Sequence, residues 1–446
     1  MNKKHKILRG FVKLIPCWLF LQTVQIALGQ SEELPNIIYI LSDDQSWNDY
    51  GFTGHPHIET PHIDKLAADG LTFTRGYVTA PLCSPSLASI ITGLYPQQHR
   101  ITGNDPKFSF NGPRYQRDWM EARARLYRDY LDEFQKHPTV PMLLQKLGYL
   151  SFQSGKWWGG HWKEGGFTHG MTHGDPSRGG RHGDEGLKIG REGMDPIYDF
   201  IDEAVEQKRP FFVWYAPFLP HSPHTPPDSL LQKYLPKAPS KAIASYWAMC
   251  EWLDVTVGQL LGKVDDMGLT DNTLVVFVTD NGWIQDPNKP NVYAPGSKQD
   301  PQDMGIRTPI IYKWPKKIAP RMDTQHVSSS IDIVTTTLAA VGLAPLSTMQ
   351  GINVMDEKAV RKRKMIFSLD FAHDMAGVDQ PGKTLESTMV ITTPWKLIVP
   401  GGANTQNQEV LLYDIVKDPT EQQNLAAQNP KVVNKLRKEM AAWWNP

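Results

Sequence analysis

The sequence predicts an α/β protein with a mostly parallel central sheet and a small C-terminal α+β subdomain. Short apolar runs rich in β-branched residues alternate with segments of helical spacing, the order expected of a parallel sheet covered by helices. From about Lys364, short strand-like pieces follow one another before one closing helix. A chain of 446 residues can bury a large core, and its 40% hydrophobic and 21% charged residues are typical of a folded globular protein.

Each predicted strand of the central sheet is an apolar run bounded by polar or turn residues. In chain order these runs are 36–41, 71–78, 149–153, 210–215, 273–279 and 308–314. The predicted helices show amphipathic spacing, and several begin near Pro or end at Gly, as does the segment from Thr60-Pro61 to Gly70. They are 60–69, 84–92, 117–136, 140–147, 196–207, 245–264 and 328–341.

The closing region, residues 364–446, is predicted to form a small subdomain packed on the larger domain of residues 30–363. Its sequence pattern differs from that of residues 30–363, because the strand-like pieces are short and are not separated by helices. These pieces are 365–368, 389–392, 395–399 and 409–413, and the closing helix is 431–444.

Residues 155–193 are predicted to form a long loop, because they contain thirteen glycines and four histidines and show little periodicity. Loops of this size in compact domains are usually functional or mobile. The histidines lack the spacing of zinc ligands on a regular element, so a structural or substrate-contacting role is favoured over a zinc site. They are His161, His169, His173 and His182.

The first 29 residues have the features of a secretory signal peptide. A basic start precedes a mostly apolar stretch, 11–28, and small residues lead up to Gly29. A membrane anchor is the alternative, but Pro and polar residues make this stretch poorly suited to span hydrocarbon. No later segment has eighteen consecutive apolar residues. We therefore expect an exported protein, secreted or periplasmic, without a stable membrane anchor.

Charge and cysteine content exclude two further classes of protein. Equal numbers of Lys+Arg and Asp+Glu, 47 of each, give no support to a nucleic-acid binder, which usually has a basic excess. The leader carries five basic residues and no acidic ones, so the mature chain has 42 against 47 and a net charge of −5. Three cysteines cannot build a disulfide scaffold. Cys17 leaves with the leader, and Cys250 lies in a helical stretch and is predicted to be core.

Two predicted strands end in pairs of oxygen-bearing residues. Asp43-Asp44 follows the run 36–41, and Asp280-Asn281 follows the run 273–279. In a parallel sheet the carboxyl ends of the strands meet at one edge, where ligands bind. Three carboxylates and one amide oxygen at that edge suit a hard divalent cation, Ca²⁺ or Mg²⁺. Taken singly, each pair is better explained by turn and cap residues, and with both pairs on matching strands a metal site becomes an equal alternative.

Cys83 immediately precedes the predicted helix 84–92. A helix N-terminus favours anionic groups and lowers the pKa of a thiol, which makes Cys83 a candidate reactive residue. The alternative is a buried, inert small residue, which is the common situation of a lone cysteine.

These features resemble the type I sulfatases, the formylglycine-dependent group of the alkaline phosphatase-like superfamily. The resemblance extends from about Pro35 to the C-terminus and rests on seven motifs in the family's order, which together are far more specific than any one of them. The motifs are PNIIYILSDDQ, CSPSLASIITGLYP, SGKWW, LPHSPHTPP, VTDNG, SKQDPQDMGIRTPIIYKWP and LLYDIVKDPTEQQNLA.

The resemblance implies hydrolysis of sulfate esters, and we expect a sulfated carbohydrate as the substrate. Cys83 would be oxidised to formylglycine by a formylglycine-generating enzyme, and the aldehyde hydrate would attack sulfur. Ca²⁺, with Mg²⁺ less favoured, would be held by this hydrate and by Asp43, Asp44, Asp280 and Asn281. The other implied residues are Lys156 and Lys298 on the sulfate group, His221 as proton carrier and His224 close to the substrate.

These residue types suit sulfate transfer independently of the resemblance. The reaction builds negative charge on the sulfate oxygens, which a divalent cation and two lysines stabilise. An imidazole moves protons at neutral pH.

Two positions depart from the family pattern. Leu87 stands where the family usually has Arg, four residues after the cysteine, and Trp158 stands where it usually has His. His161 lies close to the second position but is not assigned to that role. Trp158 is a candidate to stack on a sugar face, with aromatic packing against the loop as the equal alternative.

Two other functions stay open at the level of sequence. One is a phosphoester or phosphonate hydrolase of the same superfamily. The other is an inactive carbohydrate-binding relative, which would result if Cys83 is not modified and which Leu87 supports.

Overall fold

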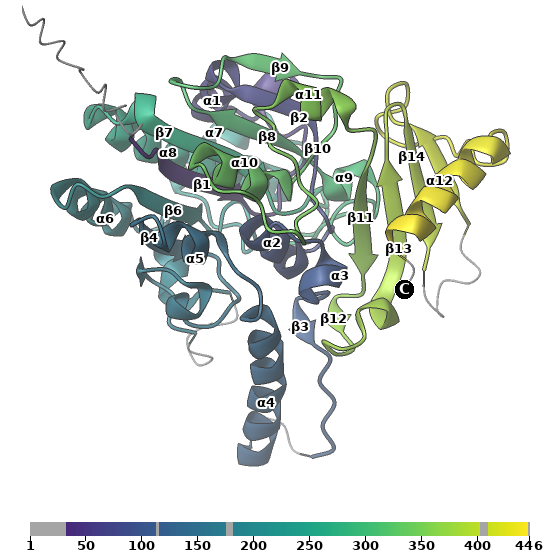
Figure 1. The fold of residues 1–446 in the computed structure, drawn as a ribbon. Helices are drawn as coiled ribbons and strands as arrows, with labels where there is room; N and C mark the ends of the chain where they lie inside the picture. The colour runs from purple at the N-terminus through teal and green to yellow at the C-terminus, as the bar shows by residue number, and fades with distance from the viewer. Residues whose placement is uncertain (1–32, 113–115, 175–181, 402–408, 445–446) are drawn as a thin grey trace, which may run out of the picture. The chain divides into compact units, whose positions relative to one another are not determined.

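A nine-stranded sheet forms the centre of the computed structural model, which describes residues 33–112, 116–174, 182–401 and 409–444 (Figure 1). Its strands are β1 (Asn36–Ser42), β2 (Leu71–Tyr77), β4 (Leu150–Gly155), β5 (His169–Gly170), β6 (Phe211–Ala216), β7 (Thr273–Thr279), β8 (Arg307–Lys313), β9 (Arg321–Asp323) and β10 (Ser328–Ser329). Their order is β10-β2-β8-β7-β1-β6-β4-β5, with β9 also paired to β2. The pairings are parallel except those of β8 with β2 and β7. The predicted α/β fold with a mostly parallel sheet is confirmed.

Helices cover both faces of this sheet, because successive residues of a strand point to opposite sides. In β1, Ile37, Tyr39 and Leu41 enter one core, whereas Ile38 and Ile40 enter the other. Because such strands are buried on both faces, their sequences are continuous apolar runs. The first core includes α2 (Cys83–Thr92), α5 (Val140–Gln145) and α10 (Asp332–Ala340), and the second includes α1 (Pro61–Asp69), α6 (Asp195–Glu206) and α8 (Lys241–Asp266).

The remaining helices connect these layers. α4 (Arg117–Phe134) extends away from the sheet and is mostly exposed, as its charged sequence predicts (Figure 1). The others are α3 (Pro96–His99), α7 (Asp228–Tyr234), α9 (Asp303–Ile306), α11 (Glu357–Lys362) and the 3₁₀ helices η1 (Gly51–Thr53), η5 (Thr270–Asn272) and η6 (Pro381–Thr384). Among the helices in the described part of the chain, none is both long and apolar enough to cross a bilayer.

The C-terminal region forms a second, four-stranded antiparallel sheet. Its strands, in the order β11-β13-β14-β15, are β11 (Ile366–Phe371), β13 (Leu385–Ile391), β14 (Trp395–Pro400) and β15 (Leu411–Asp414). One face packs against α12 (Pro430–Trp443), with Leu397 and Leu412 contacting Leu436. Residues of the other face, such as Ile398, join the first core of the large sheet. Leu34–Pro446 therefore forms one compact unit that contains both sheets.

A buried ion cluster fastens the second sheet to the first. The Lys396 ammonium, on β14, lies 3.0 Å from Asp303 Oδ1 and 2.9 Å from Glu421 Oε1, and all three side chains are excluded from solvent. Asp303 begins α9, five residues after Lys298. Because a buried charge is costly without a partner, these contacts hold the segment after Lys298 against the C-terminal sheet.

Several boundaries differ from the sequence prediction. The segment 328–341 begins as β10 and becomes helical at Asp332, whose side chain accepts a hydrogen bond from the Ser329 amide (2.8 Å). The predicted loop 155–193 contains β5, paired with β4, and the 3₁₀ helices η2 (Trp162–Gly165) and η4 (Asp184–Lys188). The short helices α3 and α7 were not predicted. The predicted signal peptide lies outside the described residues.

Helix α2, which begins at Cys83, is buried along its whole length, and its Ser89 is hydrogen-bonded to Thr79 and to His99 of α3. Ser89 Oγ lies 2.6 Å from Thr79 Oγ1 and 3.1 Å from His99 Nε2. The Ile101 amide donates to His99 Nδ1 (3.1 Å), which leaves the ring proton on Nε2. Burial lowers the pKa of His99 from its ordinary 6.5 to about 3, so the folded protein holds this imidazole neutral.

We predict that His99→Gln removes part of the acid sensitivity of folding. Unfolding exposes an imidazole that takes up a proton below pH 6.5, whereas the folded state takes it up only near pH 3. The stabilisation by neutral His99 is therefore complete above pH 6.5 and is lost as the pH falls. Urea titrations should show the wild type losing about 2 kcal/mol more than the variant between pH 7 and pH 5. Equal losses would contradict this assignment.

Candidate active site

The carboxyl ends of β1 and β7 bring four oxygen-bearing residues together. The two strands are parallel neighbours with Ser42 opposite Thr279, so Asp43-Asp44 and Asp280-Asn281 emerge side by side. The Asp44 amide donates to Asp280 Oδ1 (3.1 Å), and Asn281 Nδ2 donates to Asp44 Oδ1 (2.7 Å). Asp44 has a φ of +65°, a conformation that Asp adopts more readily than most residues and that turns the chain away from the strand.

Two buried lysines face these carboxylates from other segments. Lys156, directly after β4, lies 2.5 Å from Asp43 Oδ1 and 3.3 Å from Asp280 Oδ2. Lys298 lies 2.6 and 2.8 Å from the two oxygens of Asp44. Burial alone would lower the pKa of each lysine, but the carboxylates, chiefly Asp43 for Lys156 and Asp44 for Lys298, raise it above its ordinary value. Both ammonium groups are therefore charged.

Negative charge at this edge exceeds positive charge, since three carboxylates meet two ammonium groups. Burial, followed by the neighbouring carboxylates, raises the pKa of Asp43 well above its ordinary value although Lys156 opposes this. The pKa of Asp44 is lowered despite burial, chiefly because Lys298 stabilises its charge. A bound cation would offset this excess of negative charge.

The donor atoms fit a hard divalent cation. Asp43 Oδ2 and Asn281 Oδ1 are buried and have no hydrogen-bond partner in the described part of the chain. Ligand atoms of Asp43, Asp44, Cys83 and His221 lie within 4.8 Å of one another. Carboxylate and amide oxygens are the ligands that Ca²⁺ and Mg²⁺ prefer. The residues present therefore suit such an ion.

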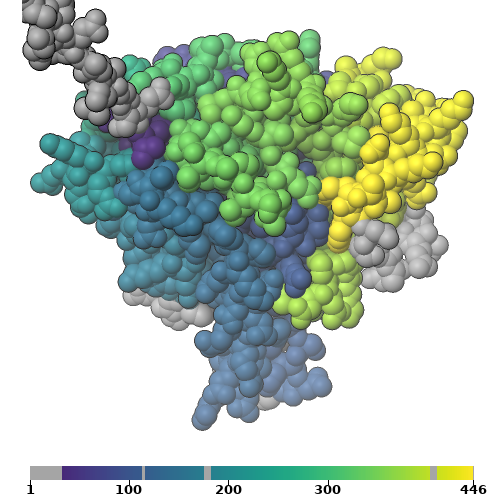
Figure 2. All heavy atoms as spheres, viewed as in Figure 1, coloured from purple at the N-terminus to yellow at the C-terminus, as the bar shows by residue number. Residues whose placement is uncertain are grey.

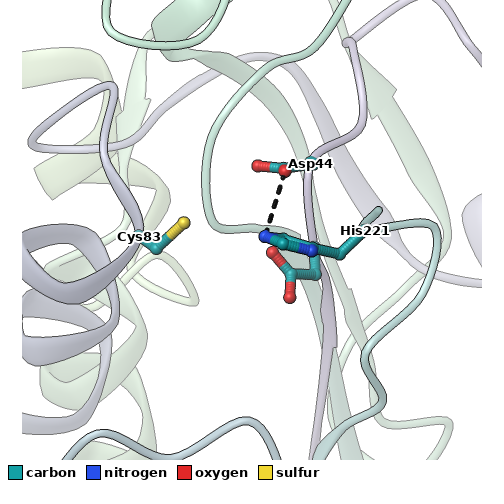
Figure 3. A group of neighbouring side chains, drawn as sticks. Asp44, Cys83 and His221 are labelled. Atoms are coloured by element: carbon teal, nitrogen blue, oxygen red, sulfur yellow. Dashed lines mark ion pairs between the residues drawn. The ribbon is translucent and has the colours of Figure 1, made fainter. Parts of the chain in front are cut away.

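Cys83 is the first residue of α2, and its sulfur points across a gap toward the ends of β1 and Asp44 (Figure 3). The side chain is 2% exposed, and the following amide, of Ser84, donates to Asn104 Oδ1 (2.9 Å). Burial raises the pKa of the Cys83 thiol to about 12, although Lys156 and Lys298 oppose this. An unmodified Cys83 is thus protonated at neutral pH and a poor nucleophile.

His221 stands beside Asp44, opposite Cys83 (Figure 3). Its Nε2 lies 3.4 Å from Asp44 Oδ2, its Nδ1 lies 2.6 Å from the Ser222 carbonyl oxygen, and its ring stacks on Phe218 (4.0 Å). Burial lowers the pKa of His221 well below its ordinary value, which Asp44 opposes and the two lysines reinforce. Because a carbonyl only accepts, Nδ1 carries the proton and Nε2 presents a lone pair.

These groups open into one cavity of about 390 Å³. Trp283 and Tyr293 form an aromatic wall, with ring centroids 5.4 Å apart and the Lys298 ammonium 5.7 Å from the Trp283 ring. Asn104 and His373 line the cavity as well. It therefore combines a charged floor with aromatic and polar walls.

The structure brings most of the predicted site residues together. Trp158 lines the cavity but is 7% exposed and packs on Phe134 and Trp157, with ring centroids 5.4 and 5.1 Å away. His224 is not among the described residues that line the cavity, and its ring lies beside Tyr246 and Trp283. Leu87 contributes an apolar surface near Cys83.

His161 does not replace the histidine missing at position 158. Its Nδ1 accepts a hydrogen bond from the Lys163 amide and caps η2, and its ring contacts His173. His182 instead lines the cavity, with its ring centroid 6.3 Å from that of His221.

Sequence reasoning missed several residues that line the cavity: Asn104, Trp283, Tyr293 and His373. His373 lies two residues after β11, a strand of the antiparallel sheet, to which the rule for the ends of parallel strands does not apply. Asn104 and Tyr293 lie in irregular segments whose sequence gives no signal of a site.

Comparisons with known proteins agree with this geometry. The sulfatase family model matches residues 35–343, and the model described as N-sulphoglucosamine sulphohydrolase, C-terminal, matches residues 299–445. The chain belongs to the sulfatase family of sulfuric ester hydrolases.

Two relatives and one solved structure illustrate the likeness. N-acetylgalactosamine-6-sulfatase of the dog, Canis lupus familiaris, is 29% identical over 368 residues, covering 74% of this chain and 66% of the relative. N-acetylgalactosamine-6-O-sulfatase of Bacteroides thetaiotaomicron is 25% identical, covering 93% and 94%. Ps i-CgsB in complex with k-i-k-neocarrahexaose has a TM-score of 0.73 at 24% identity, covering 92% of each chain, and shares the alkaline phosphatase-like fold.

The matched region spans slightly less than two thirds of the mammalian N-acetylgalactosamine-6-sulfatases. It spans nearly the whole of the bacterial relative.

We predict that Lys298→Met destabilises the protein in metal-free buffer by about 3–5 kcal/mol, because it leaves the buried Asp44 carboxylate without its main partner. Urea-induced unfolding followed by fluorescence measures the change. The matched control is Lys313→Met, since Lys313 pairs with the partly exposed Asp69 at 3.2 Å. That change should cost less than about 1 kcal/mol. Similar losses in the two variants would show that Lys298 does not carry this charge balance.

Proposed function

We propose that this chain is an exported sulfatase that hydrolyses sulfate esters of a carbohydrate, with Ca²⁺ and with formylglycine derived from Cys83. One observation carries the proposal: Lys156, Lys298, Asp44 and His221, which come from distant segments, line one cavity together with Cys83. Asp43 and Asp280 pair with Lys156 at the same edge of the sheet. Such a concentration of fixed charge suits a reaction that builds charge on sulfate oxygens.

The two lysines would bind the sulfate group. Each ammonium is buried and held by a carboxylate, Lys156 by Asp43 and Lys298 by Asp44, which keeps both side chains charged at this edge of the sheet. A Ca²⁺ ion held by Asp43, Asp44, Asp280 and Asn281 would neutralise further negative charge on the sulfate. The lysines would then be free to turn toward the substrate.

Position 83 supplies the nucleophile in this proposal, as the hydrate of formylglycine. Its place at the start of α2 puts it at the positive end of a buried helix, with the hydrogen bond from the Ser84 amide to Asn104 fixing the first turn. His221 would move the proton, since its Nε2 lone pair faces Asp44 and the cavity while Nδ1 is tied to Ser222.

The proposed substrate class rests on the cavity walls and on the relatives' names. Tyr293, which is partly exposed beside the buried Trp283, offers aromatic surface, and Asn104 and His373 offer hydrogen-bonding groups. Sugar rings combine apolar faces with hydroxyl edges, so such walls suit them. Two relatives act on N-acetylgalactosamine sulfates according to their names. The proposal has two further parts. The predicted signal peptide would direct export, and a formylglycine-generating enzyme would modify Cys83.

We expect the purified protein to hydrolyse the sulfate ester of a chromogenic alcohol much faster than the phosphate ester of the same alcohol. Cys83→Ala should lower kcat for the sulfate ester by at least about 10³-fold, because the nucleophile is lost. A panel of sulfated sugars identifies the natural class of substrate. Preference for the phosphate ester would support the phosphoester hydrolase alternative.

An intact-peptide mass spectrum covering Cys83 provides the control for these assays. Conversion of the thiol to an aldehyde lowers the mass of the peptide. A protein with the aldehyde that releases sulfate from no ester would exclude the proposed activity. Unmodified Cys83 in protein from the native host would favour the inactive carbohydrate-binding alternative, which Leu87 supports.

Calcium should stabilise the fold. At a free Ca²⁺ concentration of about 100 Kd, binding adds about 2.7 kcal/mol, which raises Tm by about 3 °C for a chain of this length. Calorimetry with Ca²⁺ and with EDTA measures the shift, and Asp280→Asn should reduce it. Asp323→Asn, which alters a carboxylate hydrogen-bonded to His326, is the control. A shift unaffected by Asp280→Asn would place the ion elsewhere.

A further inference from the structure

We propose that His373 is a specificity-determining residue that accepts a hydrogen bond from a hydroxyl group of the sugar bearing the sulfate. The inference rests on the proposed function, because it assigns a substrate contact within the same cavity. His373 belongs to the C-terminal region, between β11 and β12 (Asp374–Met375), and it lines the cavity together with Cys83.

A short junction holds His373 in place. β12 pairs with β3 (Asp105–Pro106), with Asp374 opposite Asp105, and the Asn104 amide donates to the His373 carbonyl oxygen (2.8 Å). A Cβ at Gly103 would come within 2.8 Å of that same oxygen, so glycine permits the close approach. Figure 1 shows β3 and β12 side by side, and their segments form one continuous surface in Figure 2. His373 is therefore presented from a fixed backbone.

Hydrogen bonds select one form of the His373 ring. Asn104 Oδ1 accepts from the Ser84 amide (2.9 Å), which fixes the orientation of the Asn104 side chain. Its NH₂ group lies 3.5 Å from His373 Nε2, at the limit of a hydrogen bond, so the single lone pair of Nε2 is open to a closer donor. His373 Nδ1 lies 2.6 Å from Asp374 Oδ1, a carboxylate that accepts the Nδ1 proton. Nε2 is consequently the acceptor.

The location of this acceptor suits a contact with the sugar rather than with the sulfate. Asn104 bridges His373 to Ser84, the residue after Cys83, so Nε2 lies one side chain away from the start of α2. The His373 side chain is 42% exposed, which leaves it open to a ligand. An acceptor nitrogen does not attract sulfate oxygens, whereas a sugar hydroxyl can donate to it.

Steady-state kinetics of His373→Ala on two substrates test the proposal. One substrate is the sulfated sugar of the panel that the wild type hydrolyses fastest, and the other is a chromogenic aryl sulfate without a sugar. We expect kcat/KM to fall about 10- to 100-fold for the sugar and less than about twofold for the aryl sulfate. His373→Gln, whose amide oxygen can accept the same bond, should recover part of the loss. Equal losses on both substrates, or no loss on the sugar, would overturn the proposal.

His326→Ala is the matched control, because His326 is also a half-exposed histidine bonded to an aspartate, Asp323, through Nδ1 at 2.9 Å. It should leave both values unchanged. Binding to Cys83→Ala protein provides a readout that does not need turnover: adding His373→Ala should raise the Kd of the best-binding sugar sulfate about tenfold and leave that of inorganic sulfate unchanged. If the wild type releases no sulfate, the proposed function fails, while this binding experiment still decides the role of His373.

Discussion

The close approach of three carboxylates at the ends of β1 and β7 is the constraint on which the rest of the site depends. The parallel pairing of these strands fixes the positions of Asp43, Asp44 and Asp280 next to one another. Because all three are buried, water does not screen the repulsion between their carboxylates. Positive charge must therefore come to this edge from elsewhere in the chain. Lys156 and Lys298 supply two such charges, and the donor atoms that stay unpartnered suit a divalent cation.

The fold supplies these positive groups from segments that are themselves anchored. Lys156 follows β4 directly, and its amide donates to the Ala216 carbonyl oxygen at the end of β6 (2.7 Å). Lys298 lies in an irregular segment, but that segment runs into Asp303, which is paired with the buried Lys396 of the second sheet. The C-terminal sheet therefore has two roles besides covering the core. It holds the segment that follows Lys298 in place, and its region supplies His373 to the cavity.

Much of the fold could be predicted because the strands of a sheet with helices on both faces are continuous apolar runs in the sequence. The runs 36–41 and 273–279 correspond to β1 and β7, and polar residues at their ends indicated where a ligand binds. The prediction failed where local sequence competes with tertiary contacts. The segment 328–341 has helical spacing throughout, yet Ser328-Ser329 pairs with β2 and the helix starts only at Asp332.

The sequence by itself determined the α/β fold, the residues at the strand ends and the candidate nucleophile, because each depends on local order along the chain: apolar runs, strand ends and a helix start. The tertiary structure alone decided which distant groups share the cavity. Asn104 and His373 come from segments without distinctive sequence and meet only because β3 pairs with β12. Trp158 and His224 show the converse, since packing buries one against Phe134 and places the other behind Trp283. Contacts of this kind follow from three-dimensional packing, and the spacing of residues along the chain does not predict them.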